Sequence, residues 1–361
     1  MQISDLGFVI TGKTPTTKNT DYWDGDIPFI TPGDIQETKH VFKTKRFITS
    51  QGASSVRGSL LPKDAICVSC IGTLGYVGMT TQPSVSNQQI NSIVVSPEHN
   101  PDYVYYLMKY LWPYFKNFEG QSTTLSILNK TQFSKIEIPK KSRNEEDAIA
   151  RVLSKIDEKI ELNNIINENL FQQAQAIYAD IFVSNANPAW KIGHLSDFIT
   201  VRYGKDHKKL ADGTYPLYGS GGIMRYVEKP LYDRESVLIP RKGTLNNVMY
   251  VNEPFWSVDT MFFTEMKKPN VAKFVYHYVK SKDLASLNSG SAVPSMTTDI
   301  LYSMELQIPD TDTLSKFETI VAPIYQMMRQ AQKESGKLAE LRDSLLPRLM
   351  SGEIDISKTE I

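Results

Sequence analysis

The sequence lacks several features that would assign it to well-defined protein classes. It has 2 cysteines and 5 histidines among 361 residues, and its formal net charge is zero. So few cysteines indicate a reducing compartment rather than a disulfide scaffold. No apolar run reaches the roughly 18 residues of a membrane-spanning helix, and residues 1–5 do not resemble a signal peptide. We therefore expect a cytoplasmic protein that is not inserted in a membrane.

The absence of net charge argues against a free-standing nucleic-acid binder, but the charge is unevenly distributed. Residues 1–143 contain 15 Lys and Arg against 11 Asp and Glu, whereas residues 144–185 contain 3 against 8. The acidic segment is either a solvated helix face or a spacer between domains that touch DNA. With 41% hydrophobic residues, a chain of this length predicts two folded domains.

The most informative feature of the chain is an internal duplication. Residues 64–74 match residues 235–245, because both contain an acidic residue, an apolar strand-like run and then Gly-Thr-Leu. Three further pairs occur in the same order: Gly12-Lys13 with Gly204-Lys205, Ile27-Pro28 with Tyr215-Pro216, and the equally long stretches Gly120 to Ile138-Pro139 and Gly290 to Ile308-Pro309. The sequence therefore predicts two similar domains.

A long helical segment follows each Ile-Pro step, from about Asn144 to Phe182 and from about Thr313 to Met350. Apolar residues recur every three or four positions in both segments, which predicts a coiled-coil seam. The seam residues are Ile149, Leu153, Ile156, Ile160, Leu170 and Ile177 in the first segment, and Phe317, Val321, Ile324, Met328, Leu338 and Leu345 in the second.

For the second helix to bury its seam, it should return antiparallel to the first. Asn163 and Asn167 would then face Ala331 and Ser335. These asparagines either fix the register of the pair or meet water in a loosely packed centre. Pro323 should end or kink the second helix.

Together these features predict a mixed α/β (α+β) fold in which two similar globular domains are separated by two long helices forming an antiparallel coiled coil. Strands are expected at residues 85–86, 93–95 and 237–239, and short helices at 103–118 and 271–280. The expected boundaries are a first domain at 1–143, a first helix at 144–185, a second domain at 186–312, a second helix at 313–350 and a tail at 351–361.

Two motifs suggest chemistry that the rest of the sequence does not support. Gly7–Thr14 fits the phosphate-binding loop pattern, but only six residues precede it and Pro15 argues against a following helix. Cys67 and Cys70 form a C-x-x-C pair with no second pair at a zinc-ligand spacing. We interpret the first motif as a strand with a Gly-Lys turn and the cysteines as strand residues. No metal ligands or catalytic residues are predicted.

Basic residues gather in both domains, near aromatic residues such as Trp23, Phe42 and Tyr203. Lys and Arg can bind phosphates, and Arg can read guanine, although each residue alone is as well explained by an ordinary solvated surface. The candidate DNA-binding residues are Lys13, Lys43, Lys45, Arg46 and Arg57 in the first domain, and Arg202, Lys205, Lys208, Lys209, Arg225, Arg241 and Lys242 in the second. Lys39 belongs to the first cluster as well.

The order of these elements resembles the specificity subunits of type I restriction–modification systems. The resemblance covers nearly the whole chain and rests on the two Gly-Lys openings, the two Gly-Thr-Leu turns, the two Ile-Pro steps and the ending from Leu345 to Ile354. It implies two target-recognition domains that each read half of a bipartite DNA sequence. The helices would set the gap between the half-sites and dock two adenine-N6 methyltransferase subunits.

The resemblance also implies that the chain has no active site and binds no cofactor, since S-adenosylmethionine would bind to the methyltransferase partner. Restriction and translocase subunits are further partners that the resemblance leaves open. The alternative is a duplicated β-rich scaffold that binds protein or carbohydrate ligands. It would share the duplication and the helical spacer, but it predicts no salt-dependent affinity for DNA.

Overall fold

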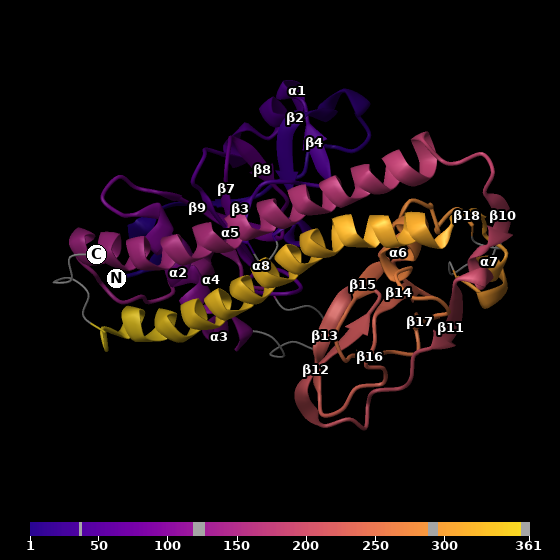
Figure 1. Cartoon of the computed structure of the whole chain (residues 1–361). Coiled ribbons are helices and arrows are strands. Elements are labelled where there is room, and N and C mark those ends of the chain that lie inside the picture. Colours follow the sequence, from indigo (N-terminus) through magenta and orange to yellow (C-terminus); the bar gives the residue numbers. More distant parts are fainter. Residues whose placement is uncertain (36–37, 118–126, 288–294, 355–361) are drawn as a thin grey trace. The chain divides into compact units, whose positions relative to one another are not determined.

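The computed structural model describes residues 1–35, 38–117, 127–287 and 295–354, which fall into two compact units. Unit 1 comprises Met1–Ile165 and Ala331–Ile361, and unit 2 comprises Ile166–Gln330. Two long helices, α5 (Arg143–Ala179) and α8 (Thr311–Ser351), each contribute to both units. Each unit therefore contains one globular domain, the first part of one long helix and the last part of the other (Figure 1).

The domain of unit 1 contains two sheets. The larger has the strand order β1-β9-β6-β7-β3 and the smaller β4-β2-β8-β5. Their strands are β1 (Gly7–Thr11), β2 (Trp23–Ile30), β3 (His40–Val41), β4 (Arg46–Ile48), β5 (Leu60–Leu61), β6 (Ile66–Ser69), β7 (Val77–Thr80), β8 (Ser84–Ser86) and β9 (Ile90–Val95). The helices are α1 (Ser50–Ser55), α2 (Pro101–Tyr110), α3 (Trp112–Lys116) and α4 (Lys130–Ser134), with short 3-10 turns η1 (Ile3–Leu6), η2 (Thr20–Tyr22), η3 (Pro32–Asp34) and η4 (Arg57–Ser59).

The domain of unit 2 repeats this plan with strand orders β11-β17-β14-β15 and β13-β12-β16, and adds a pair, β10-β18. Its strands are β10 (Lys191–His194), β11 (Ile199–Tyr203), β12 (Asp212–Gly219), β13 (Gly222–Val227), β14 (Ser236–Pro240), β15 (Met249–Val251), β16 (Trp256–Ser257), β17 (Met261–Met266) and β18 (Glu305–Ile308). The helices are α6 (Ala272–Lys280) and α7 (Thr298–Tyr302), with a π-helical turn η5 (Asp180–Ser184) and a 3-10 turn η6 (Leu195–Asp197).

The register of the strands shows that the two domains are copies of one design. In unit 1, β2 pairs in parallel with β8 through Phe29 and Val85, and in unit 2 β12 pairs in parallel with β16 through Leu217 and Trp256. Gly72 and Gly243 begin the two Gly-Thr-Leu turns with φ of 82° and 84°. This left-handed conformation favours glycine, which explains why both copies have it. The predicted duplication is confirmed.

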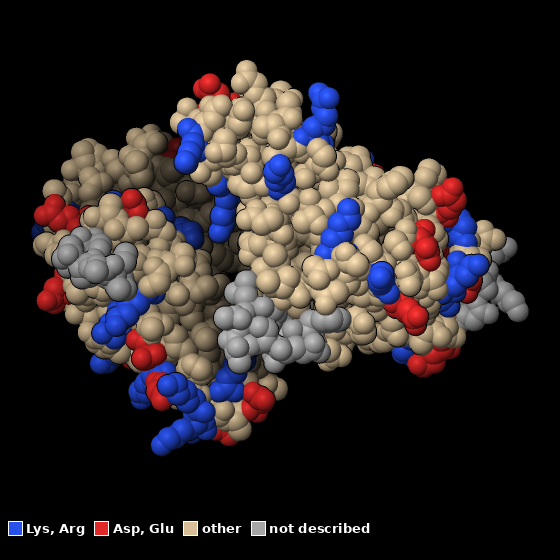
Figure 2. Space-filling model, turned by 180° about the vertical axis from the view of Figure 1, so that it is seen from behind, with Lys and Arg blue, Asp and Glu red and all other residues tan. Residues whose placement is uncertain are grey.

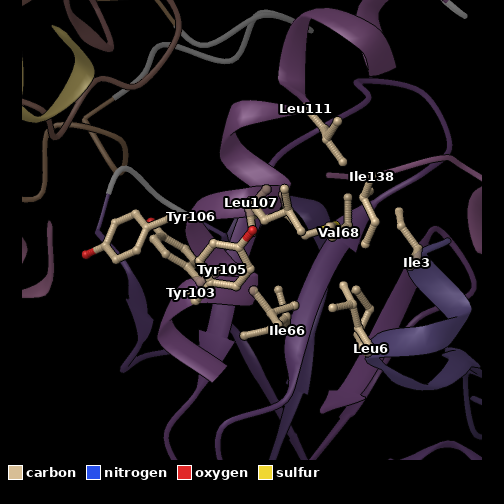
Figure 3. Packing of buried hydrophobic residues seen from close by; sticks show 14 of the residues in the cluster. Ile3, Leu6, Ile66, Val68, Tyr103, Tyr105, Tyr106, Leu107, Leu111 and Ile138 are labelled. Atoms are coloured by element: carbon tan, nitrogen blue, oxygen red, sulfur yellow. The ribbon is translucent and has the colours of Figure 1, made fainter. Parts of the chain in front are cut away.

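Helix α2 provides the centre of the unit 1 core. Asn100 caps the helix by accepting the N–H groups of Asp102 and Tyr103, and six consecutive residues from Tyr103 to Met108 are buried. A helix buried on all sides must lie inside a domain. Figure 3 shows its side chains packed against strand β6, the turn η1 and Ile138. Helix α6 takes the corresponding place in unit 2, where Ala272–Val279 are buried.

The long helices pair as predicted within unit 1, and they are also part of the two hydrophobic cores. In unit 1, Ile149, Leu153 and Leu349 belong to the same hydrophobic cluster as the domain, and in unit 2 Phe317 and Val321 do so. Within unit 1 the two helices run antiparallel, because Asp157 pairs with Arg342 while Asn163, further along α5, pairs with the earlier residue Ser335. All the predicted seam residues are buried or half-buried, but Asp157 and Ser154 are more deeply buried than Ile156 and Ile160. The reason is that α5 packs on its domain as well as on α8.

Asn163 faces Ala331 and Ser335 on the other long helix, as predicted. Its Nδ2 donates to the Ala331 carbonyl at 3.4 Å, to Ser335 Oγ at 3.3 Å and to a Glu334 carboxylate oxygen at 2.9 Å. The partner expected for Asn167 stays a prediction.

Two details differ from the sequence-based expectations. Pro323 does not end α8, which continues for twenty-eight residues to Ser351. The buried neighbours Val321 and Ile324 hold this turn in the unit 2 core, which outweighs the roughly 3 kcal/mol cost of an internal proline. The helix expected at 103–118 is divided at Leu111, because Pro113 has no N–H for the ladder, and Phe118 lies outside the described residues. Gly120 and Gly290 also lie outside them.

Candidate nucleic-acid interface

The two misleading motifs are resolved by the geometry of unit 1. Gly7–Thr11 is strand β1, and no helix follows it before the 3-10 turn at Thr20, so it is not a phosphate-binding loop. Cys67 lies in β6 and Cys70 directly follows it; both are buried and free. Burial raises the pKa of the Cys67 thiol to about 11 and that of Cys70 to about 12, so neither is a thiolate near neutral pH. The first interpretation is confirmed, and the second is confirmed for Cys67 but not for Cys70, which lies just beyond the end of the strand.

A matched glycine explains the two Gly-Lys openings. Gly12 follows β1 and Gly204 follows β11. A Cβ on Gly12 would meet the Asn87 carbonyl oxygen at 2.1 Å, and one on Gly204 would meet the Val258 carbonyl oxygen at 2.0 Å. Only glycine allows this close approach of two backbone segments. The same edge of the larger sheet is therefore constructed in the same way in both units.

In unit 1, Lys13 lies at this edge, and the segment that contains Arg57 packs beside it. Both side chains are exposed. Their segments adjoin because Ser59 Oγ, in the η4 turn with Arg57, donates to the Thr11 carbonyl at 3.0 Å. Lys43 and Lys45 are exposed on the segment that leads into β4, on the smaller sheet.

In unit 2, the corresponding edge carries a larger set of basic residues. Lys205, Lys208 and Lys209 are exposed after the end of β11, and Lys242 is exposed after β14. Arg241 is half-buried, and its guanidinium lies 5.4 Å from the ring centroid of Tyr203. Arg202 forms an exposed ion pair with Glu265 at 3.0 Å, and the hydrogen bond that its guanidinium donates to this carboxylate raises the pKa of the guanidinium.

Arg46 and Arg225 occupy matched positions in the two domains. Each pairs with the matched residue of the neighbouring strand, Phe29 or Leu217. The Arg46 guanidinium lies 3.5 Å over the Trp23 ring, whereas Arg225 forms an ion pair with Asp212 at 2.8 Å. Trp23 and Asp212 both stand at the start of a β-bulge in the neighbouring strand, so the two arginines hold the bulges in place.

Lys39 cannot belong to a DNA-binding surface, contrary to the sequence-based expectation. Its side chain is 3% exposed, and Nζ lies 2.6 Å from a carboxylate oxygen of Asp102 and 2.9 Å from Ser154 Oγ. An amphipathic pattern does not reveal this long-range pairing, because Ser154 is 115 residues away along the chain.

Sequence reasoning missed polar residues on the same sheet edges. In unit 1, Thr14 Oγ1 donates to Gln88 Oε1 at 2.7 Å, and Gln88 is exposed. In unit 2, Asp259 and Thr260 follow β16 at the matching place. The offset of 171 residues between Gly72 and Gly243 also aligns Ser86 with Ser257, and extending that alignment would have identified these positions.

The charged surface is dispersed rather than continuous. In Figure 2, Lys and Arg side chains stand singly in the part of unit 1 that holds β2, β4 and α1, where they outnumber Asp and Glu, and they form small groups elsewhere on this face. Across the described ranges, no group of three or more His, Cys, Asp or Glu side chains could hold a metal ion. Within those same ranges, no helix has the length and apolarity needed to cross a membrane.

Two copies of one mixed α/β unit, each with a basic sheet edge and two long-helix segments, define a tandem recognition protein. The family described as "Type I restriction modification DNA specificity domain" matches residues 1–172 and 187–340. The chain therefore belongs to the type I restriction–modification specificity-subunit family, whose role is DNA sequence recognition and whose members are non-catalytic components of these systems. The resemblance noted from the sequence is confirmed, and the scaffold alternative finds no support.

Individual relatives agree with this assignment. The chain is 25% identical to the "Type I restriction enzyme MjaIX specificity subunit" of Methanocaldococcus jannaschii, over 99% of this chain and 93% of the relative. It is 36% identical to the "Type I restriction enzyme HindI specificity subunit" of Haemophilus influenzae, over 46% of this chain and 37% of the relative. The crystal structure of a type I S subunit from M. genitalium has the same fold, with a TM-score of 0.57 at 20% identity and coverage of 97% and 95%.

Proposed function

We propose that this chain reads a bipartite DNA target, with unit 1 recognising one half-site and unit 2 the other. The observation that carries the proposal is that two domains share one backbone framework but present different side chains at the matched sheet edge. Gly12 and Gly204 are packed in the same way, while Gln88 in one unit corresponds to Asp259 in the other. Domains that read different bases should differ in this way.

The basic residues at the edges contact the DNA backbone in this proposal. Lys13 and Lys205 follow the matched glycines, and both are exposed. Contacts of lysine with phosphate position a protein on the duplex without reading its sequence, and they make the affinity depend on salt. The remaining candidates Lys43, Lys45, Arg57, Lys208, Lys209 and Lys242 are exposed as well and would add to this backbone contact.

The arginines of the bulges would contribute less. Arg225 donates to the carbonyls of His207 and Leu210 as well as to Asp212, so most of its donors are already engaged. Arg46 is exposed and stacked, which leaves the edge of its guanidinium open to a phosphate.

The long helices would set the gap between half-sites and dock the partners. A helix of 37 residues such as α5 spans roughly 56 Å at about 1.5 Å per residue. Exposed apolar side chains on these helices, Leu162 and Leu341 in unit 1 and Ile320 and Met327 in unit 2, offer contact area to another protein. We propose two adenine-N6 methyltransferase subunits as partners, which bring S-adenosylmethionine, and restriction–translocase subunits that join them, all in the cytoplasm.

The experiment is to express the chain together with its cognate methyltransferase subunit and to map N6-methyladenine across the host DNA. The expected result is one split motif with two fixed halves and an unread gap, which disappears when this chain is omitted. A methylation pattern that does not depend on this chain, together with the absence of a complex, would contradict the proposal.

A further inference from the structure

The matched sheet edges contain one basic position that the units share and one that they do not. Gly12 N–H donates to the Ile90 carbonyl and Gly204 N–H donates to the Met261 carbonyl, both at 3.0 Å, so Lys13 and Lys205 leave the sheet from equivalent points. At the offset of 171 residues, by contrast, Arg241 in unit 2 corresponds to Cys70 in unit 1. Cys70 is only 2% exposed, so its short side chain cannot reach a ligand at the surface.

Arg241 is held at this edge by its backbone and by an aromatic ring. Its N–H donates to the Thr260 carbonyl at 2.9 Å, which fixes the start of the side chain beside β17. The guanidinium lies 5.4 Å from the centroid of Tyr203, a ring that is 53% exposed and packs edge-on against Phe262. Stacking of this kind limits the rotamers of an arginine and orients its planar fork of donors.

The donors of Arg241 are less engaged than those of Arg202 and Arg225, the other arginines near this edge. Its Nη1 makes one long hydrogen bond, 3.3 Å, to the Asp259 carbonyl. Arg202 and Arg225, by contrast, are paired with the carboxylates of Glu265 and Asp212. Within the described ranges, no ion pair is formed by Arg241. Arg241 is thus oriented and can still donate two parallel hydrogen bonds.

The geometry points to Arg241 as a base-reading residue that recognises guanine in the half-site bound by unit 2, while Lys13 and Lys205 bind phosphate. Guanine presents O6 and N7 as two acceptors in the major groove, which match the guanidinium fork. The DNA backbone is common to both half-sites, so residues that bind it can be the same in both units. Bases differ between half-sites, so an arginine present in one unit only is suited to a base.

This inference rests on the proposed function, and it also makes a statement about unit 1. Because Cys70 is buried and Ile71 has no hydrogen-bonding side chain, unit 1 has no donor that corresponds to Arg241. The two half-sites should therefore differ at the matched step, with a guanine that is read by arginine in one half only.

The test uses the full chain in complex with its methyltransferase partner. Each position of the mapped motif is replaced in turn by the other three bases in synthetic duplexes, and methylation rates are measured for the unchanged chain, Arg241→Lys, Arg241→Ala and Lys205→Ala. Arg241→Lys keeps the positive charge and loses the two-donor fork. Circular dichroism and size-exclusion chromatography verify that each variant folds and assembles.

We expect both Arg241 variants to lose discrimination for guanine at one position of one half-site, by about 5- to 150-fold. Lys205→Ala should instead slow methylation of all duplexes by a common factor and reduce the salt dependence of binding by about one phosphate contact. If Arg241→Lys methylates every duplex as the unchanged chain does, or if both Arg241 variants slow all duplexes by one factor, Arg241 is a backbone or structural residue and the inference is wrong. Failure of the unchanged complex to methylate any split motif would instead contradict the proposed function.

Discussion

The two units differ most where each domain meets its long helices. In unit 1, Tyr106 of α2 donates to Asp157 of α5 at 2.6 Å, and Arg342 of α8 pairs with the same carboxylate at 2.7 Å. Asp157 and Arg342 are 3% and 8% exposed, so this is a buried ionic junction. It connects three elements of unit 1 at one carboxylate.

At the matched positions, unit 2 has a neutral contact, although Lys273 of α6 and Glu318 of α8 form an ion pair at 2.6 Å elsewhere in the same unit. Offsets of 171 and 168 residues place His277 and Tyr325 where unit 1 has Tyr106 and Asp157, and these two side chains form a hydrogen bond at 2.9 Å. Ala174 stands in the position of Arg342 and is fully buried. The duplicated architecture has thus kept the location of a polar contact but not its chemistry. A polar contact in an otherwise apolar seam fixes the register of the packed helices, and either chemistry can serve.

The largest effect is expected from breaking the ionic junction. Arg342→Ala leaves the Asp157 carboxylate buried without its cation and should lower the free energy of unfolding of unit 1 by about 3–5 kcal/mol. Hydrogen exchange read by mass spectrometry resolves the units and measures this loss. Arg348→Ala is the matched control on the same helix, since the Arg348–Glu353 pair is 51% and 60% exposed and should contribute less than about 1 kcal/mol. Equal losses from the two variants would contradict the account.

A second prediction tests whether the sheet edges are constructed in the same way. Gly12→Ala and Gly204→Ala each force a Cβ against a backbone carbonyl, and each should destabilise its own unit by about 1–3 kcal/mol. Thermal unfolding followed by hydrogen exchange locates the loss. Gly58→Ala and Gly221→Ala are controls, because a Cβ at either position meets nothing within 4 Å. If only one of the two buried glycines tolerates alanine, the two edges are not equivalent.

The third prediction is that the stability of unit 2 depends on pH through His277. Burial lowers the pKa of His277 from 6.5 to about 4, so the folded state holds this side chain neutral while the unfolded chain takes up a proton below about pH 6.5. The free energy of unfolding of unit 2 is therefore highest above pH 6.5, and it decreases as the pH falls toward 4. At pH 5 unit 2 should have lost about 2 kcal/mol relative to pH 7. Urea unfolding at both pH values, with His277→Gln as the variant that lacks the dependence, measures the difference; a variant with the same pH dependence would assign it to other groups.

The smallest effect is expected at the neutral junction itself. Tyr325→Phe removes only the hydroxyl that contacts His277 and should cost about 1 kcal/mol, well below the loss from Arg342→Ala. The same hydrogen-exchange measurement applies to unit 2. A loss as large as that in unit 1 would mean that the neutral contact determines register as strongly as the ionic one.

The sequence alone predicted the features that repeat. The Gly-Thr-Leu turns, the Gly-Lys openings and the pair of long helices could be found by comparing the chain with itself, because a shared backbone restricts the residues at matched places. The rejection of Gly7–Thr14 as a phosphate-binding loop followed from the short segment before it and from Pro15.

The features that the sequence did not predict depend on contacts between distant residues. Arg342 occupies a seam position of the second long helix, where the helical repeat predicts an apolar residue. Its partner Asp157 is 185 residues away along the chain. Lys39 has the sequence context of a surface residue and is buried beside Asp102. Pro323 is tolerated within α8 because the surrounding side chains are buried in unit 2. Periodicity and propensity describe neighbours along the chain, so they do not identify such pairs.

The central claim, that each unit reads its own half of a split DNA target, is tested most directly by exchanging one domain. Residues 1–143 are replaced by the corresponding domain of another family member, and N6-methyladenine is mapped with the methyltransferase partner present. The account predicts that one half of the motif changes while the other half and the length of the gap stay the same. A motif that changes in both halves, or in neither, would contradict it.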